Sequence, residues 1–235
     1  MQKLALLGWI VGLLAVCSPL PAQEIRFPVR HDHVIGSCTG ELIFRNDGVE
    51  YATQDTKHAR VWKYEDIQQM GLLGPKVISI LTYEDSKWKL GKDRAFHFKI
   101  TKGEIGAPLW TMLQTKLSRP LVSAIVPADI ASRYSIPAKH ERGFAGSQGT
   151  LEFSDQYIMY KTGTKKDSRI WRYEDISSIG TTGPYQLRLT SMDRTQGETA
   201  AERNFVFSLK QKLQSAIYDF IWWKINGPKI SAARR

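Results

Sequence analysis

Residues 62–67 read Trp-Lys-Tyr-Glu-Asp-Ile, and residues 171–176 read Trp-Arg-Tyr-Glu-Asp-Ile. The two hexapeptides lie 109 positions apart, from Trp62 to Trp171. Recurrence at a fixed offset is the sequence signature of a repeated structural unit. The chain is therefore expected to contain two copies of one fold, each organised around this hexapeptide.

The offset of 109 holds without a gap over most of each unit. It relates Gly40 and Gly149, Leu42 and Leu151, Tyr51 and Tyr160, Gly74 and Gly183, Phe96 and Phe205, and Phe98 and Phe207. Such a run predicts a duplicated domain of roughly 90–95 residues per copy, a usual domain size. The predicted boundaries are 24–117 for the first copy, 118–132 for a linker, 133–226 for the second copy and 227–235 for a basic tail. Because the linker is apolar between its prolines, we expect it to pack on one or both copies.

Residues 1–22 have the pattern of a secretory signal peptide. Lys3 precedes the apolar stretch 4–16, and the Pro-containing stretch 18–22 ends it. A second pattern, at residues 14–18, resembles the lipobox of bacterial lipoproteins and would place a lipid anchor on Cys17. We expect an exported protein, periplasmic or secreted, with the lipoprotein as the minor alternative. No other segment is long and apolar enough to predict a transmembrane helix.

The chain is basic, with a formal net charge of +10. Such a charge favours anionic partners, although export argues against nucleic acid, and a charge spread over solvated faces is the simpler interpretation. After signal cleavage Cys38 would be the remaining cysteine, so no intrachain disulfide is expected. The protein must then be stabilised by its apolar core.

Alternating apolar residues predict six strands and a closing helix in each copy. The strands are expected at 25–30, 40–44, 49–52, 60–64, 76–83 and 95–101, and at 134–139, 150–153, 157–162, 169–173, 186–191 and 204–209. The helices are expected at 108–117 and 210–226, the second ended by Gly227 and Pro228.

The acidic pair in the hexapeptide does not predict catalysis, because adjacent strand residues point to opposite faces. We expect Asp66 and Asp175 to cap a short helical turn, with Gln69 completing a capping box in the first copy. The other signature residues are expected to pack in the core: Trp62, Tyr64 and Ile67, and Trp171, Tyr173 and Ile176.

This order of elements resembles the pleckstrin-homology (PH) superfold, and more closely GRAM-like and bacterial PH-like domains. The resemblance rests on the Gly-x-Leu strands at Gly40 and Gly149, on the two Asp-Ile pairs, and on the Phe-x-Phe strands at Phe96 and Phe205. It implies a mainly β fold with α: two tandem PH-like domains, each a strongly bent antiparallel sheet or partly open barrel closed by one C-terminal amphipathic helix. A seventh strand is not evident in either copy. In this family, ligands are bound at loops opposite the helix.

Two sets of loop residues are candidate sites. The first contains metal-ligand types, His31, His33, Cys38 and His58, on two loops that the PH-like geometry brings together. Imidazole and thiolate suit zinc or copper. Of these positions, the second copy keeps only the histidine, His140, and has Ser147 and Asp167 in place of Cys38 and His58.

The second set is basic and lies in loops of the second copy: Lys139, Arg142, Lys161, Lys165, Lys166 and Arg169. If the PH-like geometry brings these loops together on one rim, the side chains could bind phosphate or an anionic lipid head group. A solvated lysine-rich turn explains them equally well.

The sequence contains no motif of a Ser/His/Asp catalytic triad, no Gly-rich phosphate loop and no His-Glu-x-x-His helix. We therefore expect no enzyme and no cofactor, but a non-catalytic binding or scaffold module. An unknown protein is the expected partner. Binding of an anion or an anionic membrane surface through the second copy is the alternative, and metal binding in the first copy is a minor one.

Overall fold

The structure, a computed structural model, describes residues 24–33, 36–86, 91–143, 145–164, 166–194 and 202–234. These residues form a mainly β protein with two α-helices and two short 3-10 turns. The predicted signal peptide, including Cys17, lies outside the described residues. Within them, neither helix has the length and apolar character that crossing a membrane requires.

The elements of the first half lie on both sides of the first hexapeptide, residues 62–67. They are β1 (Ile25–Asp32), β2 (Ser37–Phe44), β3 (Gly48–Thr53), β4 (Arg60–Lys63), the turn η1 (Tyr64–Asp66), β5 (Ile67–Leu72), β6 (Val77–Asp85), β7 (Asp93–Ile100) and α1 (Ala107–Lys116). The short strand β8 (Leu121–Ser123) follows.

The second half repeats this order. It contains β9 (Tyr134–Arg142), β10 (Ala145–Phe153), β11 (Tyr157–Thr162), β12 (Arg169–Arg172), the turn η2 (Tyr173–Asp175), β13 (Ile176–Gly180), β14 (Gln186–Ser191), β15 (Arg203–Leu209) and α2 (Ser215–Ala233). The pairing register repeats too: Val29 lies opposite Gly40, and Ala138 opposite Gly149.

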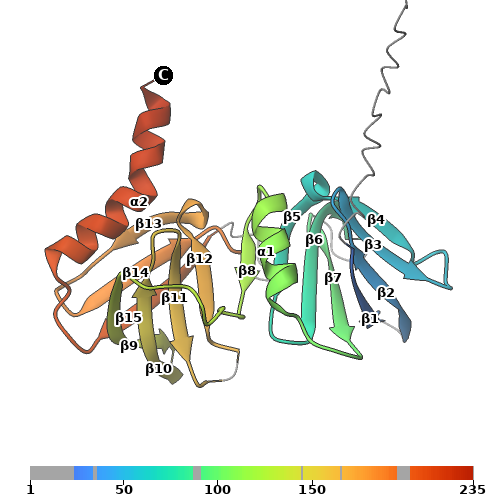
Figure 1. The fold of residues 1–235 in the computed structure, drawn as a ribbon, viewed down its shortest axis with the longest axis horizontal. Helices are drawn as coiled ribbons and strands as arrows, with labels where there is room; N and C mark the ends of the chain where they lie inside the picture. The colour runs from blue at the N-terminus through green and yellow to red at the C-terminus, as the bar shows by residue number, and fades with distance from the viewer. Residues whose placement is uncertain are drawn as a thin grey trace, which may run out of the picture.

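All fifteen described strands belong to one open sheet, ordered β13-β14-β15-β9-β10-β11-β12-β8-β5-β6-β7-β1-β2-β3-β4. Figure 1 shows the two halves side by side with β8 between them. Strand β8 pairs antiparallel with β12 at Ile170 and Ser123, and parallel with β5. The linker was expected to pack on the copies, and this prediction is confirmed, because β8 is buried and hydrogen-bonded to both halves.

Two apolar cores lie within the sheet, one for each half. The first core also takes in Met159 and Ile170 from the second half. Trp110 on α1 contacts Tyr157 across the junction, with ring centroids 5.4 Å apart. The predicted core roles of the signature aromatics are confirmed, since the tryptophans and tyrosines of both hexapeptides are buried. The halves therefore share apolar contacts as well as the sheet.

The predicted helical caps at Asp66 and Asp175 are wrong. Each aspartate lies inside a three-residue 3-10 turn without a side-chain cap, and each turn runs directly into a seventh strand, β5 or β13. Both strands carry a register shift just after their first residue, between Ile67 and Gln69 in β5. A β-bulge adds one residue to the strand. The buried residues Ile67 and Met70 are therefore spaced three apart, which imitates a helix.

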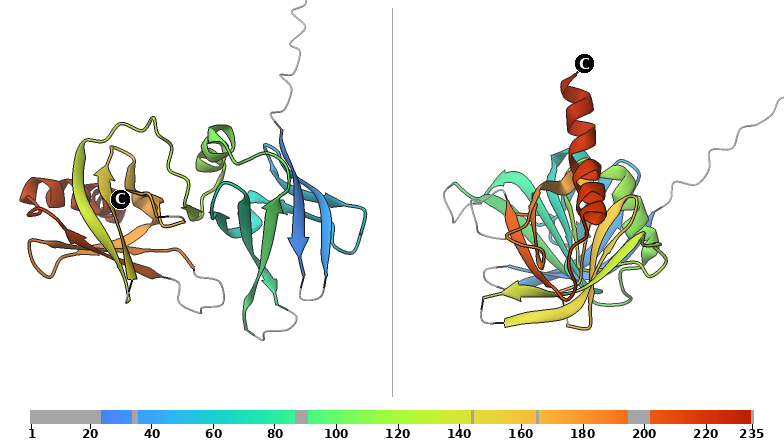
Figure 2. Two further views of the ribbon diagram at one scale, coloured as in Figure 1. Left: turned by 90° about the horizontal axis from the view of Figure 1, so that it is seen from below. Right: turned by 90° about the vertical axis from the view of Figure 1, so that its left-hand side faces the viewer.

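The predicted end of the second helix at Gly227 is also wrong, because α2 continues through Pro228 to Ala233 and includes most of the expected basic tail. A proline inside a helix removes one backbone hydrogen bond and bends it. The Asn226 side chain donates to the Trp222 carbonyl and Ser231 to the Gly227 carbonyl, which supports the backbone around the proline. Figures 1 and 2 show α2 bent, with its C-terminal part projecting from the sheet.

Candidate functional site

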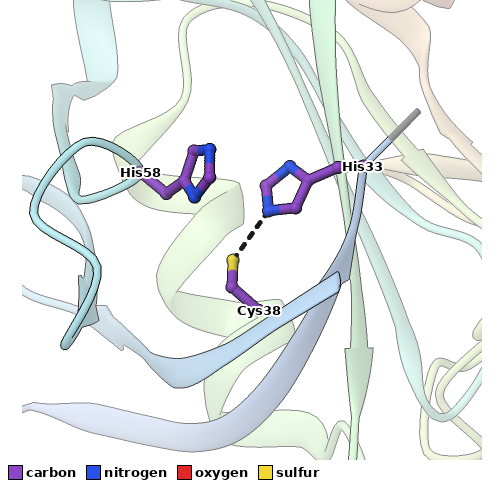
Figure 3. A group of neighbouring side chains, drawn as sticks. All are labelled: His33, Cys38 and His58. Carbon is purple, nitrogen blue, oxygen red and sulfur yellow. Dashed lines mark hydrogen bonds between the residues drawn. The ribbon is translucent and has the colours of Figure 1, made fainter. Parts of the chain in front are cut away.

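Three of the four predicted metal-ligand residues meet at one end of the first half (Figure 3). His33 follows β1, Cys38 lies in β2, and His58 lies in the loop before β4. One potential ligand atom from each lies within 4.8 Å of the others. His33 Nε2 is 2.9 Å from Cys38 Sγ, and the two imidazole rings stack with centroids 4.1 Å apart. The convergence follows from the pairing of β1 with β2 and of β2 with β3.

Polar groups surround this His/Cys group. The Tyr51 hydroxyl lies 3.0 Å from Cys38 Sγ, and Asp55 Oδ2 lies 2.8 Å from His58 Nδ1. Burial raises the pKa of Tyr51, so its hydroxyl stays protonated and can donate a hydrogen bond to the sulfur. Burial, and then the charge of His58, lowers the pKa of His33, which favours its neutral imidazole. Neutral imidazole is the form that binds a metal ion.

His31 lies next to the group, with its ring centroid 4.6 Å from that of His33, but it belongs to the core. It is 7% exposed, its Nδ1 lies 2.8 Å from the His97 carbonyl oxygen, and its ring packs 5.0 Å from that of Phe98. His140 packs in the same way, 5.1 Å from Phe207. The one histidine that both copies share therefore has a packing role in each, and the structure does not place His31 among the metal ligands.

The equivalent positions of the second half form a closed polar network. Arg142, Ser147 and Asp167 replace His33, Cys38 and His58. Asp167 is 4% exposed, pairs with Arg142 Nη1 at 2.7 Å, accepts a hydrogen bond from Ser147 Oγ, and lies 3.2 Å from His140 Nδ1. Burial acts to raise the pKa of Asp167, but the Ser147 and His140 hydrogen bonds outweigh it and lower that pKa. Arg142 and Ser147 both bond to Asp167, so the charge of this buried carboxylate is compensated within the network.

The predicted basic site does not form an unpaired cationic rim among the described residues. Lys139 pairs with Glu141 at 3.2 Å, Arg142 with Asp167, and Lys161 with Glu152 at 2.8 Å. Arg169 is half-buried, and burial lowers its pKa despite the charge of Asp193. Lys166 is exposed, at φ 64°, with no ion pair to any residue that the structure describes. Lys165 lies outside the described residues.

A buried arginine at the junction of the halves was not predicted from the sequence. Arg172 binds Asp175 through Nε at 2.8 Å and Nη2 at 2.9 Å. It also donates to the carbonyl oxygens of Leu117 and Arg119 at 2.9 and 2.8 Å. The one available signal was the difference between Lys63 and Arg172 within otherwise identical hexapeptides. A guanidinium can make these four bonds, whereas an ammonium presents only three donors.

The buried and half-buried histidines predict a loss of stability in mild acid. Burial lowers the pKa values of the buried His31 and His140 and of the half-buried His97 below the ordinary 6.5, in His140 against the effect of Asp167. Just below pH 6.5 the unfolded chain then binds more protons than the folded chain, so stability falls as the pH falls through the folded pKa values. Urea unfolding at about pH 7.5 and about pH 6 should show a decrease of up to about 1.4 kcal/mol per pH unit for each histidine.

The matched variant for this measurement is His140→Gln, which should flatten the pH dependence. Burial raises the pKa values of Asp175 and Asp193 above 3.8, so these carboxyls act in the opposite sense at more acid pH. The comparison is therefore confined to the range just below 6.5. Stability that is constant or rises as the pH falls through that range would contradict the assignment.

No protein-family model matches the chain, and no curated protein matches it. Among solved structures, it is similar to the C-terminal domain of an unknown protein from Leishmania infantum, with a TM-score of 0.32 and 11% identity over 40% of this chain and 84% of that one. It is also similar to the Spt16D Pob3N heterodimer, with a TM-score of 0.28 and 9% identity over 71% of this chain and 81% of that one. Neither likeness is strong enough to carry an argument about this chain.

Proposed function

We propose that the chain is an exported, non-catalytic interaction module of two tandem PH-like repeats, and that it binds an extended segment of a partner protein along β4. The observation that carries the proposal is a difference between equivalent residues. Val61 in β4 is 75% exposed, whereas Ile170, its counterpart in β12, is 2% exposed. The same apolar position is covered in one half and uncovered in the other.

The chain itself provides the cover for β12. Strand β8 pairs with β12 at Ile170 and joins the sheet there. In the first half β4 ends the sheet, with no strand beyond it among the described residues. An exposed edge strand offers unpaired backbone groups to an extended peptide, and neighbouring side chains supply specificity. The partner segment that fits is therefore extended and apolar, like Leu121-Val122-Ser123 in β8.

The opposite end of the sheet is protected. Strand β13 lies beside α2, and Lys229 Nζ on that helix lies 3.4 and 3.2 Å from the carbonyl oxygens of Ile176 and Ser177. A lysine at a sheet edge discourages further pairing. Of the two sheet edges, β4 is therefore the one available to a partner strand.

One further observation supports the repeat architecture, and another favours partner binding over anion binding. Each half has seven strands and a following helix in one shared register, as expected of a PH-like repeat. The cationic side chains that were candidates for an anion site mostly face carboxylates of their own half. Displacing those carboxylates would oppose the binding of an external anion.

The test uses a fluorescent peptide with the sequence of residues 119–127, which contains β8. We expect it to bind the protein and to slow amide hydrogen exchange in Arg60–Lys63. Burial of a valine side chain contributes about 1.5–3 kcal/mol, so Val61→Lys should weaken binding about 10–100-fold. The matched control is Tyr185→Lys, which also replaces an exposed apolar side chain, 57% exposed, by a cation.

Binding without protection of β4, or equal weakening by the two lysine variants, would place the peptide elsewhere. Failure of the peptide to bind at all would remove the analogy between β4 and β12 on which the proposal rests.

A further inference from the structure

We propose that His33, Cys38 and His58 together bind one metal ion of the zinc and copper class. The proposal is independent of partner binding at β4. It rests on the donor set, on the distances within the group, on the groups around it, and on a comparison with the equivalent positions of the second half.

The donor set selects the class of ion. Two imidazoles and one thiolate are ligands for zinc and copper, whereas magnesium and calcium require oxygen ligands. His31 is not part of the set, because the described ligand atoms that lie within 4.8 Å of one another come from His33, Cys38 and His58. The proposed set is therefore three protein ligands.

The distances are close to those of a bound ion. Ligand atoms around tetrahedral zinc lie about 3.3–3.5 Å apart, given bonds of about 2.0 Å to nitrogen and 2.3 Å to sulfur. In the group they lie within 4.8 Å of one another, and His33 Nε2 is 2.9 Å from Cys38 Sγ. Small side-chain rotations would bring all three onto one ion. A tetrahedral ion would keep one position for water or another ligand.

The surroundings suit a metal site. Tyr51 can donate a hydrogen bond to the sulfur, and Asp55 lies beside His58 Nδ1. Such partners orient ligands and tune their basicity. Cys38 and Asp55 also line an open surface hollow with Thr39 and Gly40.

The second half shows what the same scaffold does without ligand residues. Tyr160 and His140 match Tyr51 and His31 and pack alike. At the three remaining positions, Arg142, Ser147 and Asp167 neutralise and hydrogen-bond one another. In the first half the same three positions hold two imidazoles and a thiol, all of which can bind zinc or copper. Among the described residues, the only hydrogen bond within the group of His33, Cys38 and His58 joins His33 to Cys38.

The experiment measures metal uptake by the purified, reduced protein in competition with a chromophoric chelator. Zn²⁺ and Cu⁺ are tested separately, with Ca²⁺ as the oxygen-preferring control. We expect one equivalent of Zn²⁺ or Cu⁺, and no uptake of Ca²⁺. Tyr51→Phe should weaken binding about 10–100-fold, the usual effect of losing a group that supports a ligand. His97→Gln, which removes an imidazole outside the group, should leave the affinity unchanged.

The decisive variant combines His33→Arg, Cys38→Ser and His58→Asp, which copies the residues of the second half. Because those residues already fold on the equivalent scaffold, this variant should remain folded, as circular dichroism can verify, and should lose the bound equivalent. Uptake that persists in this variant would overturn the proposal. The proposal would also be overturned if the wild type bound neither Zn²⁺ nor Cu⁺ in a one-to-one ratio.

Discussion

Replacing Arg172 by alanine is expected to lower the free energy of unfolding by about 3–5 kcal/mol, measured by urea denaturation at neutral pH. Arg172 and Asp175 are 8% and 5% exposed and joined by two hydrogen bonds. Removing the guanidinium leaves the carboxylate buried without its cation. It also leaves the carbonyl groups of Leu117 and Arg119 without the donor that ties them to β12.

The repeat offers a matched control for this prediction. Lys63 occupies the equivalent position in the first half, with its side chain 73% exposed and only a 3.5 Å contact to Glu65. Lys63→Ala should therefore leave stability nearly unchanged, since exposed ion pairs contribute little. The double variant Arg172→Ala with Asp175→Ala should recover part of the loss, because no unpaired charge remains. Equal losses from Arg172→Ala and Lys63→Ala would show that the buried pair has no special role.

The repeat in the sequence allowed most of the fold to be predicted, because strand positions and pairing follow from alternating apolar residues and recur after 109 residues. The errors arose where local spacing imitated another element. The bulges after Ile67 and Ile176 imitate a helical turn. Gly227 and Pro228 read as a helix end, but the side chains of Asn226 and Ser231 support a bend instead.

What could not be predicted depends on contacts between residues far apart in the chain. The joining of both halves into one sheet requires β8 to pair on both sides at once, and no local pattern encodes that. The loops of His33, Cys38 and His58 were expected to meet because the resemblance to PH-like domains implied that these loops lie at one end. The ion pairs of the basic set could not be predicted, because the partners Glu141, Glu152 and Asp167 become neighbours only once the strands pair.

Replacing Gly149 by alanine is the second change expected to have a large effect, a loss of about 3–5 kcal/mol in the free energy of unfolding. A Cβ atom on Gly149 would lie 2.3 Å from the Lys161 carbonyl oxygen and 2.9 Å from Cζ of Tyr160. Backbone atoms cannot yield at such distances without separating β10 from β11. Tyr160 is fully buried, and its hydroxyl donates to the Ser147 carbonyl at 2.6 Å. Displacing the ring therefore also breaks a buried hydrogen bond.

Gly163→Ala is the matched control, because a Cβ there meets nothing within 4 Å and the glycine lies in the loop that follows β11. Gly40→Ala tests the same argument in the first half, where the Cβ would lie 2.2 Å from the Ala52 carbonyl oxygen and 2.9 Å from the Tyr51 ring. If the tyrosine lying across the strand is what requires glycine, both Gly-x-Leu variants should lose stability by similar amounts and Gly163→Ala should lose little. A small effect at Gly149 and Gly40 would mean that the strands can separate to admit a methyl group. The glycine shared by the two repeats would then have no steric explanation.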